Sequence, residues 1–258
     1  MDIKTSKILV TGGASGMGRH FVLSLARDGA DVAFCDLNQD AVSAVEAEAA
    51  ARGLPGKVKG FIANVGKEED VVALVPAAAA ALGGLTGIVN NAGIIRDGLL
   101  VKVDKETGAV IKFPLSKWQQ VLDVNLTGVF LGAREFAAYI IENKVKQSVI
   151  ISISSISRHG NMGQGNYSAA KAAIVADTAL WAGELARYGI RTGAIAPGFT
   201  RTPILEGMPP EALAKVSAPV PLKRIGEPEE MYLTVKFIIE NDYFTGRVID
   251  VDGGLRLS

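Results

Sequence analysis

The chain has 258 residues, of which 48% are hydrophobic and 21% charged, enough apolar material for one sizeable domain. Its 27 basic and 27 acidic residues balance, so the charge offers no basis for binding nucleic acid or an anionic membrane surface. The single cysteine, Cys35, excludes an internal disulfide. We expect one domain over residues 1–258 in a reducing, cytoplasmic setting. We expect no signal peptide and no segment as long as a membrane span.

Short apolar runs alternate with longer stretches of helical character along the chain. Strands are predicted at residues 7–10, 31–35, 57–65, 87–91, 148–154, 191–197 and 246–252, and helices at 17–28, 39–52, 67–82, 116–143, 166–188 and 227–240. Strands that are apolar at consecutive positions are typical of a sheet buried on both faces. The alternation therefore predicts an α/β fold, in which a parallel sheet carries helices on both sides.

Two segments depart from this alternation. Residues 99–103 and 109–113 are alternating runs on either side of a glycine-containing loop, which predicts a β-hairpin. The hairpin is either a surface excursion or, as we expect, a rim of the substrate site or an oligomer contact. The proline-rich stretch 203–228 contains a predicted short helix at 210–216, and we expect it to form a lid over the substrate.

The first predicted strand runs through a glycine-rich turn directly into the first predicted helix. Glycine allows a tight turn and a close approach of the backbone to a diphosphate, and the free N–H groups at a helix start attract phosphate. No Gly-Lys-Ser/Thr follows, which disfavours a nucleoside-triphosphate loop. The turn therefore predicts dinucleotide binding by Gly12, Ser15, Gly16, Met17 and Gly18.

Asp36 stands at the end of the second predicted strand. A carboxylate at this place can accept both ribose hydroxyls of NAD and would repel the 2′-phosphate of NADP. It can also cap the next helix, a role equally open to Asn38. A 2′-phosphate would be expected to have a basic residue at positions 13–17 or at position 37. None of these positions is basic, and position 37 is Leu37, so the sequence favours NAD(H) over NADP(H).

Tyr167 and Lys171 are four residues apart on a predicted helix and therefore share one face. A nearby ammonium lowers the pKa of a tyrosine from roughly 10 and makes it usable as a proton donor and acceptor. Taken alone, Tyr-x-x-x-Lys is more often structural than catalytic. Ser154 and Ser155 close the preceding apolar strand. A hydroxyl there either stabilises charge on a substrate carbonyl or merely satisfies a turn.

Taken in order, these motifs resemble the short-chain dehydrogenase/reductase family over nearly the whole chain. The matching segments are Thr11-Gly12-x-x-x-Gly16-x-Gly18, Asn90-Asn91-Ala92-Gly93, Asn125 within DVNLTG, Tyr167 with Lys171, Pro197-Gly198 with Thr202, and VDGG at 251–254. The resemblance implies a single Rossmann-like, doubly wound domain with a seven-stranded parallel sheet, assembled as a homotetramer.

The resemblance also implies roles for individual residues. Tyr167 transfers the proton, Lys171 binds the nicotinamide ribose and lowers the tyrosine pKa, and Asn125 holds a water in a proton relay. A serine orients the substrate carbonyl; the strand end favours Ser155, and the family's usual spacing favours Ser154. Further expected cofactor contacts are Leu37, Tyr167 itself and Asn64, where the family usually has aspartate. The others are Val65, Asn91, Ala92, Gly93, Pro197, Gly198, Thr200 and Thr202.

The predicted function is an NAD(H)-dependent oxidoreductase that interconverts a ketone and a secondary alcohol. The runs NAGIIRDGLL and GNMGQGNYSAAK look like 3-oxoacyl-carrier-protein reductases, so an NADPH-dependent thioester reductase is an alternative, although Asp36 argues against NADPH. A non-catalytic NAD sensor is a further alternative, but such proteins tend to lose the tyrosine or the lysine. His159 is a candidate for lining the substrate pocket. No cluster has metal-ligand spacing, so no metal is expected.

Overall fold

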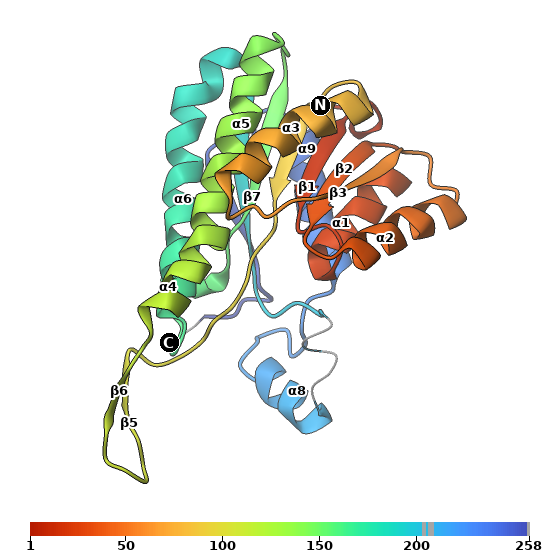
Figure 1. Ribbon diagram of the computed structural model, residues 1–258. Coiled ribbons are helices and arrows are strands. Elements are labelled where there is room, and N and C mark those ends of the chain that lie inside the picture. The colour runs from red at the N-terminus through yellow and green to blue at the C-terminus, as the bar shows by residue number, and fades with distance from the viewer. Residues whose placement is uncertain (203–204, 206–208, 257–258) are drawn as a thin grey trace.

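The computed structural model describes residues 1–202, 205 and 209–256 (Figure 1). Seven strands form one parallel sheet in the order β3-β2-β1-β4-β7-β8-β9. The strands are β1 (Lys7–Thr11), β2 (Asp31–Asp36), β3 (Val58–Ile62), β4 (Gly87–Asn90), β7 (Ser148–Ile153), β8 (Ile190–Pro197) and β9 (Arg247–Val251). This confirms the predicted α/β fold with its seven-stranded parallel sheet.

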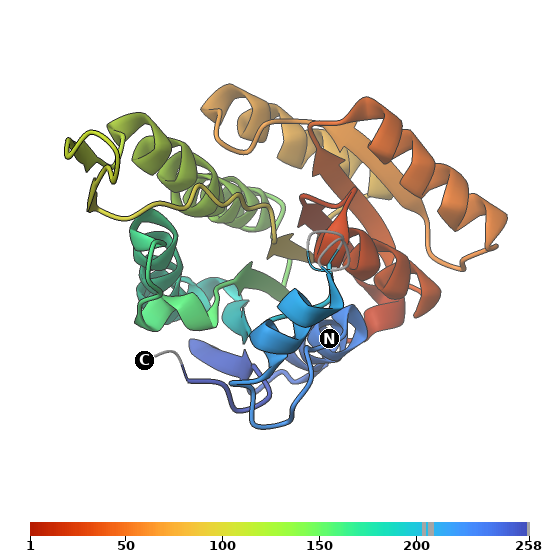
Figure 2. The same ribbon diagram turned by 90° about the horizontal axis from the view of Figure 1, so that it is seen from below.

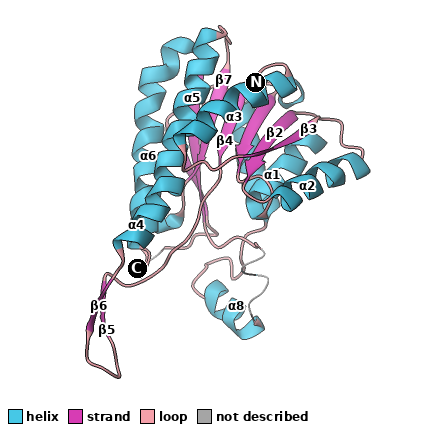
Figure 3. Cartoon of the chain, viewed as in Figure 1, coloured by secondary structure: helices cyan, strands magenta, loops and turns pink. Residues whose placement is uncertain are grey.

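Helices cover both faces of the sheet (Figures 1 and 3). The main helices are α1 (Gly16–Arg27), α2 (Gln39–Ala51), α3 (Glu68–Leu82), α4 (Leu115–Leu122), α5 (Gly128–Glu142), α6 (Gly165–Leu185), α8 (Pro210–Ser217) and α9 (Pro228–Glu240). Helices α1, α2 and α9 pack on one face, where Phe21, Phe34 and Tyr232 are fully buried. Helices α3 and α5 pack on the other face with Leu9 and Phe136. The two buried layers explain why the strands read as continuous apolar runs.

Short helical turns complete the chain and refine the predicted boundaries. Three of them are 3-10 turns: η1 (Ile3–Thr5), η3 (Ile156–His159) and η4 (Ala186–Tyr188). The predicted helix 116–143 is α4 and α5 joined by η2 (Asp123–Thr127), a π-helical turn in which the Gly128 N–H donates to the Asp123 carbonyl. The predicted strand 57–65 is shorter as β3, because the Asn64 N–H donates to the Asp70 carboxylate and the chain leaves the sheet.

The joined helix Leu115–Glu142 corrects the expectation that no segment is as long as a membrane span. Its 28 residues, with a mean hydropathy of 1.2 in the most apolar window, are long and apolar enough by composition to cross a membrane. Half of that window is buried inside the fold. The helix packs on α3, α6 and β4, as the core helix of an α/β domain does. Its length is therefore weak support for a membrane span.

Two small elements lie apart from the main layers (Figure 1). β5 (Val101–Val103) and β6 (Val110–Lys112) pair antiparallel and confirm the predicted hairpin, which projects beyond the start of α4. Helix α8 confirms the predicted short helix and lies beyond the carboxyl edge of the sheet (Figure 2). Of the predicted lid at 203–228, residues 203–204 and 206–208 lie outside the described residues.

The sheet order places a chain reversal between β1 and β4. From β1 the chain proceeds outward to β2 and β3, and it then returns to β4 on the other side of β1. Ligands of open α/β sheets bind outside the carboxyl ends of the strands at such a switch point. The glycine turn after β1 and the segment after β4 meet there.

Candidate active site

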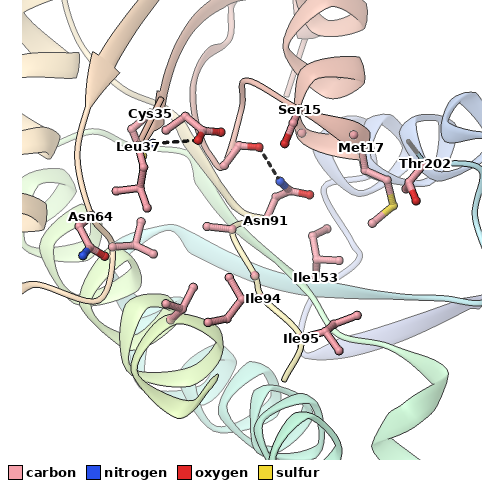
Figure 4. Close-up of a pocket in the computed structure, with 18 of the residues that line it drawn as sticks. Ser15, Met17, Cys35, Leu37, Asn64, Asn91, Ile94, Ile95, Ile153 and Thr202 are labelled. Atoms are coloured by element: carbon pink, nitrogen blue, oxygen red, sulfur yellow. Dashed lines mark hydrogen bonds between the residues drawn. The ribbon is translucent and has the colours of Figure 1, made fainter. Parts of the chain in front are cut away.

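A cavity of about 470 Å³ opens at this switch point (Figure 4). Most of the predicted cofactor residues line it: Gly12, Ser15, Gly16, Met17, Gly18, Asp36, Leu37, Asn64, Val65, Asn91, Ala92, Gly93, Tyr167, Lys171 and Thr202. Sequence reasoning missed six lining residues: Cys35, Ala63, Ile94, Ile95, Val124 and Ile153. Cys35 and Ile153 lie at or near the ends of β2 and β7, Val124 lies in η2, and the other three follow strands. Their apolar character alone gives no sign that they face a cavity.

The glycines of the turn are needed for close packing inside the protein. A Cβ atom on Gly18 would lie 1.9 Å from the Gly12 carbonyl oxygen. The first turn of helix α1 can therefore pack this closely on the glycine turn only because residue 18 has no side chain. Gly12 has a φ of +64°, and its Cβ would lie 2.8 Å from the Ala92 Cα. Gly16 has a φ of +49°, where an L side chain is strained. The turn can therefore lie against both α1 and the segment after β4.

Side-chain hydrogen bonds tie the turn to β4. The Asn91 Nδ2 donates to the carbonyl oxygens of Thr11 and Gly12 at 3.0 and 3.1 Å. Figure 4 shows Asn91 beside the turn. In return, the Thr11 hydroxyl accepts from the N–H groups of Asn91 and Ala92 at 3.0 and 3.1 Å. These four bonds hold the strand ends that border the cavity in one arrangement.

The start of α1 fits the diphosphate of a dinucleotide. Ser15 is the N-cap residue and makes no side-chain hydrogen bond to the helix, and the first backbone bond is from Arg19 N–H to the Ser15 carbonyl. Among the described residues, nothing therefore caps the N–H groups of the first turn, which face the cavity through Gly16 and Met17. Such groups, with the positive end of the helix dipole, suit an anion.

Asp36 ends β2 and Asn64 follows β3, and both line the cavity; Asn64 is labelled in Figure 4. The Asp36 carboxylate accepts from the Ala14 N–H at 3.1 Å and the Leu37 N–H at 2.8 Å. One carboxylate oxygen thus contacts the glycine turn and the other contacts the backbone after β2. Acceptor capacity remains for a ligand, because a carboxylate has about four acceptor sites. The Asn64 Oδ1 accepts from the Gly66 N–H at 3.0 Å, so one of its two lone pairs is already used.

Helix α6 brings Tyr167 and Lys171 to the cavity, one turn apart. The Lys171 Nζ lies 5.5 Å from the centre of the Tyr167 ring and donates to the Ile153 carbonyl at 2.7 Å. Burial lowers the pKa of Lys171 to about 8.

The pKa of Tyr167 moves opposite to the expected direction. Burial raises it, a hydrogen bond with Ser155 opposes the rise, and the negative charge of Asp97 adds to it. The expected lowering of this pKa by Lys171 is not found: the hydrogen bond with Ser155 is the contact that lowers it, and desolvation outweighs that bond. Tyr167 consequently holds its proton at neutral pH, the state in which it can act as an acid.

The two candidate serines have different surroundings. The Ser154 hydroxyl donates to the Lys171 carbonyl at 2.7 Å and is buried against α6. The Ser155 Oγ accepts from the Ser157 N–H at 3.1 Å and lies at hydrogen-bonding distance from the Tyr167 side chain. The structure therefore brings Ser155, rather than Ser154, to the phenol.

Two buried asparagine side chains form hydrogen bonds with the backbone of the segment after β4, next to the site. The Asn125 amide, in the π-helical turn, accepts from the Ile94 N–H at 2.8 Å and donates to the Ile94 carbonyl at 2.9 Å. The Asn166 Nδ2 donates to the carbonyls of Arg96 and Lys117, both at 3.1 Å. Asn166 precedes Tyr167, and sequence reasoning missed it because a lone asparagine has no distinguishing spacing.

Some predicted residues lie away from the cavity lining. Pro197 ends β8, and Gly198 and Thr200 follow it; the Gly198 N–H donates to the Val251 carbonyl. His159 is exposed at the end of η3 and is not among the lining residues. No group of three or more metal-ligating side chains occurs within residues 1–202, 205 and 209–256.

Comparison with known proteins places the chain among dinucleotide-dependent enzymes. The family described as enoyl-(acyl carrier protein) reductase matches residues 12–256. A 3-oxoacyl-(acyl-carrier-protein) reductase of Thermotoga maritima is 38% identical over 258 residues, with 99% of each chain covered. A (3R)-3-hydroxyacyl-CoA dehydrogenase of Mus musculus is 35% identical, covering 99% of this chain and 98% of the relative. A short-chain type dehydrogenase/reductase from Mycobacterium marinum superposes with a TM-score of 0.85 at 31% identity, covering 98% of this chain and 96% of that chain.

Proposed function

Because the chain belongs to the short-chain dehydrogenase/reductase family, we propose that it interconverts a 3-oxoacyl thioester and the corresponding 3-hydroxyacyl thioester with NAD(H). One observation carries the reaction type: the Tyr167 phenol, hydrogen-bonded to Ser155 and one helical turn from Lys171, faces the cavity at the glycine turn. The names of the relatives from Thermotoga maritima and Mus musculus support the substrate class.

Each side chain at the site has a different role towards the carbonyl group of the substrate. Tyr167, protonated at neutral pH, donates its proton to the carbonyl oxygen during reduction and takes it back during oxidation. Ser155 donates a hydrogen bond to the same oxygen and stabilises its developing negative charge. Lys171 stabilises the phenolate that remains. When bound, the nicotinamide supplies or accepts the hydride. The apolar Ile94, Ile95 and Ile153 exclude water from the cavity.

The preference for NAD(H) rests on the surroundings of Asp36. Its carboxylate lines the cavity, and of the described residues that line it only Lys171 is basic. A 2′-phosphate beside Asp36 would meet an uncompensated like charge, whereas ribose hydroxyls would meet an acceptor. An NADPH-dependent thioester reductase is the competing function, and a direct comparison of the two cofactors decides between them.

The test is reduction of acetoacetyl-CoA with NADH and with NADPH, followed by loss of cofactor absorbance. A simple ketone and a sugar ketone serve as comparison substrates. We expect turnover with acetoacetyl-CoA, a higher kcat/KM with NADH, and a loss of roughly 10²–10⁴-fold in the Tyr167→Phe variant. Full turnover in this variant would exclude the proposed chemistry, and preferential turnover of a simple ketone would exclude the substrate class.

We also propose that the chain assembles into a homotetramer. Large apolar side chains remain exposed on two faces of one copy: Phe130, Ile141 and Leu180 on α5 and α6, and Phe237 and Tyr243 on and after α9. Exposed apolar clusters on a folded chain favour association with other copies. Light scattering coupled to gel filtration measures the assembly, and a monomer at micromolar concentration would contradict it.

A further inference from the structure

We propose that Gln164 is a positioning residue, which holds Ser155 in its reactive place through Ser157, and that Asp97 sets the orientation of the Gln164 amide. The inference rests on the proposed function, because Ser155 has to be oriented only if the site acts on a carbonyl. It concerns a chain of hydrogen bonds that runs from the segment after β4 to the catalytic end of β7.

The chain of contacts begins at Asp97 and ends at Ser155. The Gln164 Nε2 donates to the two carboxylate oxygens of Asp97 at 3.1 and 3.3 Å. The Gln164 Oε1 accepts from the Ser157 hydroxyl at 3.1 Å and from the Asn161 Nδ2 at 2.9 Å. The Ser157 N–H then donates to the Ser155 Oγ at 3.1 Å. Gln164 thus bridges two segments that both border the reacting groups.

Donor and acceptor chemistry fixes the direction of this chain. A carboxylate only accepts hydrogen bonds, so Asp97 requires the amide nitrogen of Gln164 to face it. The amide oxygen must then face the Ser157 hydroxyl and Asn161, which both donate to it. With the opposite orientation, the amide oxygen would face the carboxylate and two acceptors would meet. Asp97 is exposed, so its role is that of a hydrogen-bond acceptor at a defined place.

Further hydrogen bonds, beside the Asp97–Gln164 contact, join the same two segments of the backbone. The Gly98 N–H donates to the Gly163 carbonyl at 2.8 Å, and the Asn166 side chain binds the Arg96 carbonyl on the other side of Gln164. The segments 96–98 and 163–166 are therefore held together on both sides of the Asp97–Gln164 contact. Rigidity here matters because Tyr167 directly follows Asn166.

The last hydrogen bond of this series, from Ser157 to Ser155, determines what the Ser155 hydroxyl can do. Because the Ser155 Oγ accepts from the Ser157 N–H, one of its lone pairs is occupied and its own proton is free to donate. The donor direction points to the neighbouring phenol oxygen or to a carbonyl bound beside it. If Ser157 moves, Ser155 loses the contact that selects this rotamer, and the hydroxyl spends less time in the productive direction.

A double-mutant cycle on kcat for acetoacetyl-CoA reduction tests the coupling. We expect Gln164→Leu to lower kcat roughly tenfold to a hundredfold, with the Kd for NADH, measured by fluorescence, changed less than about twofold. In a Ser155→Ala background the same change should have little further effect, because both act through one hydroxyl. Asp97→Asn keeps an acceptor for the Gln164 amide and should retain kcat, whereas Asp97→Leu should resemble Gln164→Leu. Additive losses in the double variant would overturn the proposal.

A readout without substrate separates this proposal from the proposed function. Ultraviolet titration of tyrosinate, taken as the difference between each protein and its Tyr167→Phe counterpart, reports the pKa of Tyr167. A Ser155 hydroxyl aimed at the phenol lowers that pKa, so Gln164→Leu should raise it towards the Ser155→Ala value. Wild-type protein that reduces no carbonyl would defeat the proposed function alone, and an unchanged Tyr167 pKa in Gln164→Leu would defeat the positioning role alone.

Gln147→Leu is the matched control. Gln147 is exposed just before β7, at the opposite edge of the sheet from the cavity. The same chemical change there should leave kcat, the NADH Kd and the tyrosinate titration at wild-type values. If Gln147→Leu and Gln164→Leu lose kcat equally, the loss is a general effect of destabilising the fold, and the assignment to Gln164 is wrong.

Discussion

The hydroxyl of Ser154 donates to the backbone carbonyl of Lys171 across 2.7 Å, so its proton is committed to holding α6 against β7. Ser155 has no such commitment and lies beside Tyr167. We therefore expect Ser155→Ala to lower kcat roughly 10²–10³-fold, the loss typical of one donor to a developing oxyanion.

The matched variant Ser154→Ala should keep kcat within a few-fold and instead lower the free energy of unfolding by about 0.5–1.5 kcal/mol, because a buried hydrogen bond is lost while the Lys171 carbonyl keeps its partner within α6. Steady-state kinetics and urea unfolding measure the two effects. A larger loss of kcat in Ser154→Ala than in Ser155→Ala would reverse the assignment.

Lys171 is buried as a charged group at neutral pH, which disfavours the folded state. Its pKa is lowered by burial to about 8, against roughly 10.4 in an unfolded chain, so the unfolded chain binds more protons between these pH values. Its penalty is therefore complete below about pH 8 and vanishes as the pH rises towards roughly 10.4. We expect Lys171→Met to raise the free energy of unfolding by about 1–2 kcal/mol at neutral pH, after the lost bond to Ile153 is counted, and to abolish most turnover.

Urea unfolding of Lys171→Met and wild type across this pH range gives the comparison. The stability gain should shrink with rising pH. Lys146→Met, which removes an exposed lysine, should show no such pH-dependent gain. A variant at Lys171 that is less stable than wild type at every pH would mean that burial does not disfavour its charge.

Gly18 and Gly183 should respond in opposite ways to alanine. The Gly18 Cβ would overlap the Gly12 carbonyl, which would push α1 away from the turn, so we expect loss of NADH binding and a destabilisation of about 1–3 kcal/mol. Gly183 is exposed in the interior of α6, and a Cβ there meets nothing within 4 Å. Its alanine variant should gain about 0.5–1 kcal/mol. Thermal unfolding and NADH fluorescence measure both, and unimpaired NADH binding by Gly18→Ala would contradict the close packing.

Asp36 should set the choice between the two cofactors. Asp36→Asn keeps an acceptor for the Ala14 N–H and removes the charge that a 2′-phosphate would meet. We expect the ratio of kcat/KM for NADH over NADPH to fall at least about tenfold, which corresponds to about 1.4 kcal/mol. Asp40→Asn, on the exposed start of α2, is the control and should leave the ratio unchanged. Equal shifts in both variants would point to a general effect of surface charge.

We expect the β5–β6 hairpin either to contact the substrate or to form part of the interface between copies of the chain. Val101, Val103 and Val110 are more than half exposed on it, and the cross-strand register pairs Val103 with Val110. An isolated two-stranded hairpin is marginally stable, so we expect another surface to cover these side chains. Replacing residues 101–112 by a short glycine turn should raise the KM for acetoacetyl-CoA or change the oligomer size in gel filtration. If both stay at wild-type values, the hairpin is only a surface excursion.

The sequence alone was sufficient for the parallel sheet, for the glycine turn between β1 and α1, and for the shared helix face of Tyr167 and Lys171. Runs of consecutive apolar residues report burial on both faces, and the four-residue spacing of Tyr167 and Lys171 reports a shared helix face. These are local properties, because each depends only on the geometry of one strand, turn or helix. The hairpin at 99–113 was predictable on the same ground.

Tertiary packing decided what local pattern left open. Ser154 and Ser155 are adjacent in the chain, and only the position of α6 shows that one binds the Lys171 carbonyl and the other reaches Tyr167. The rise in the Tyr167 pKa follows from burial by surrounding segments, which no spacing encodes. Gln164 and Asp97 are far apart in sequence, and they meet only because the sheet brings the segments after β4 and β7 to one edge. Contacts of this kind depend on three-dimensional placement, and a single sequence does not contain the distances that create them.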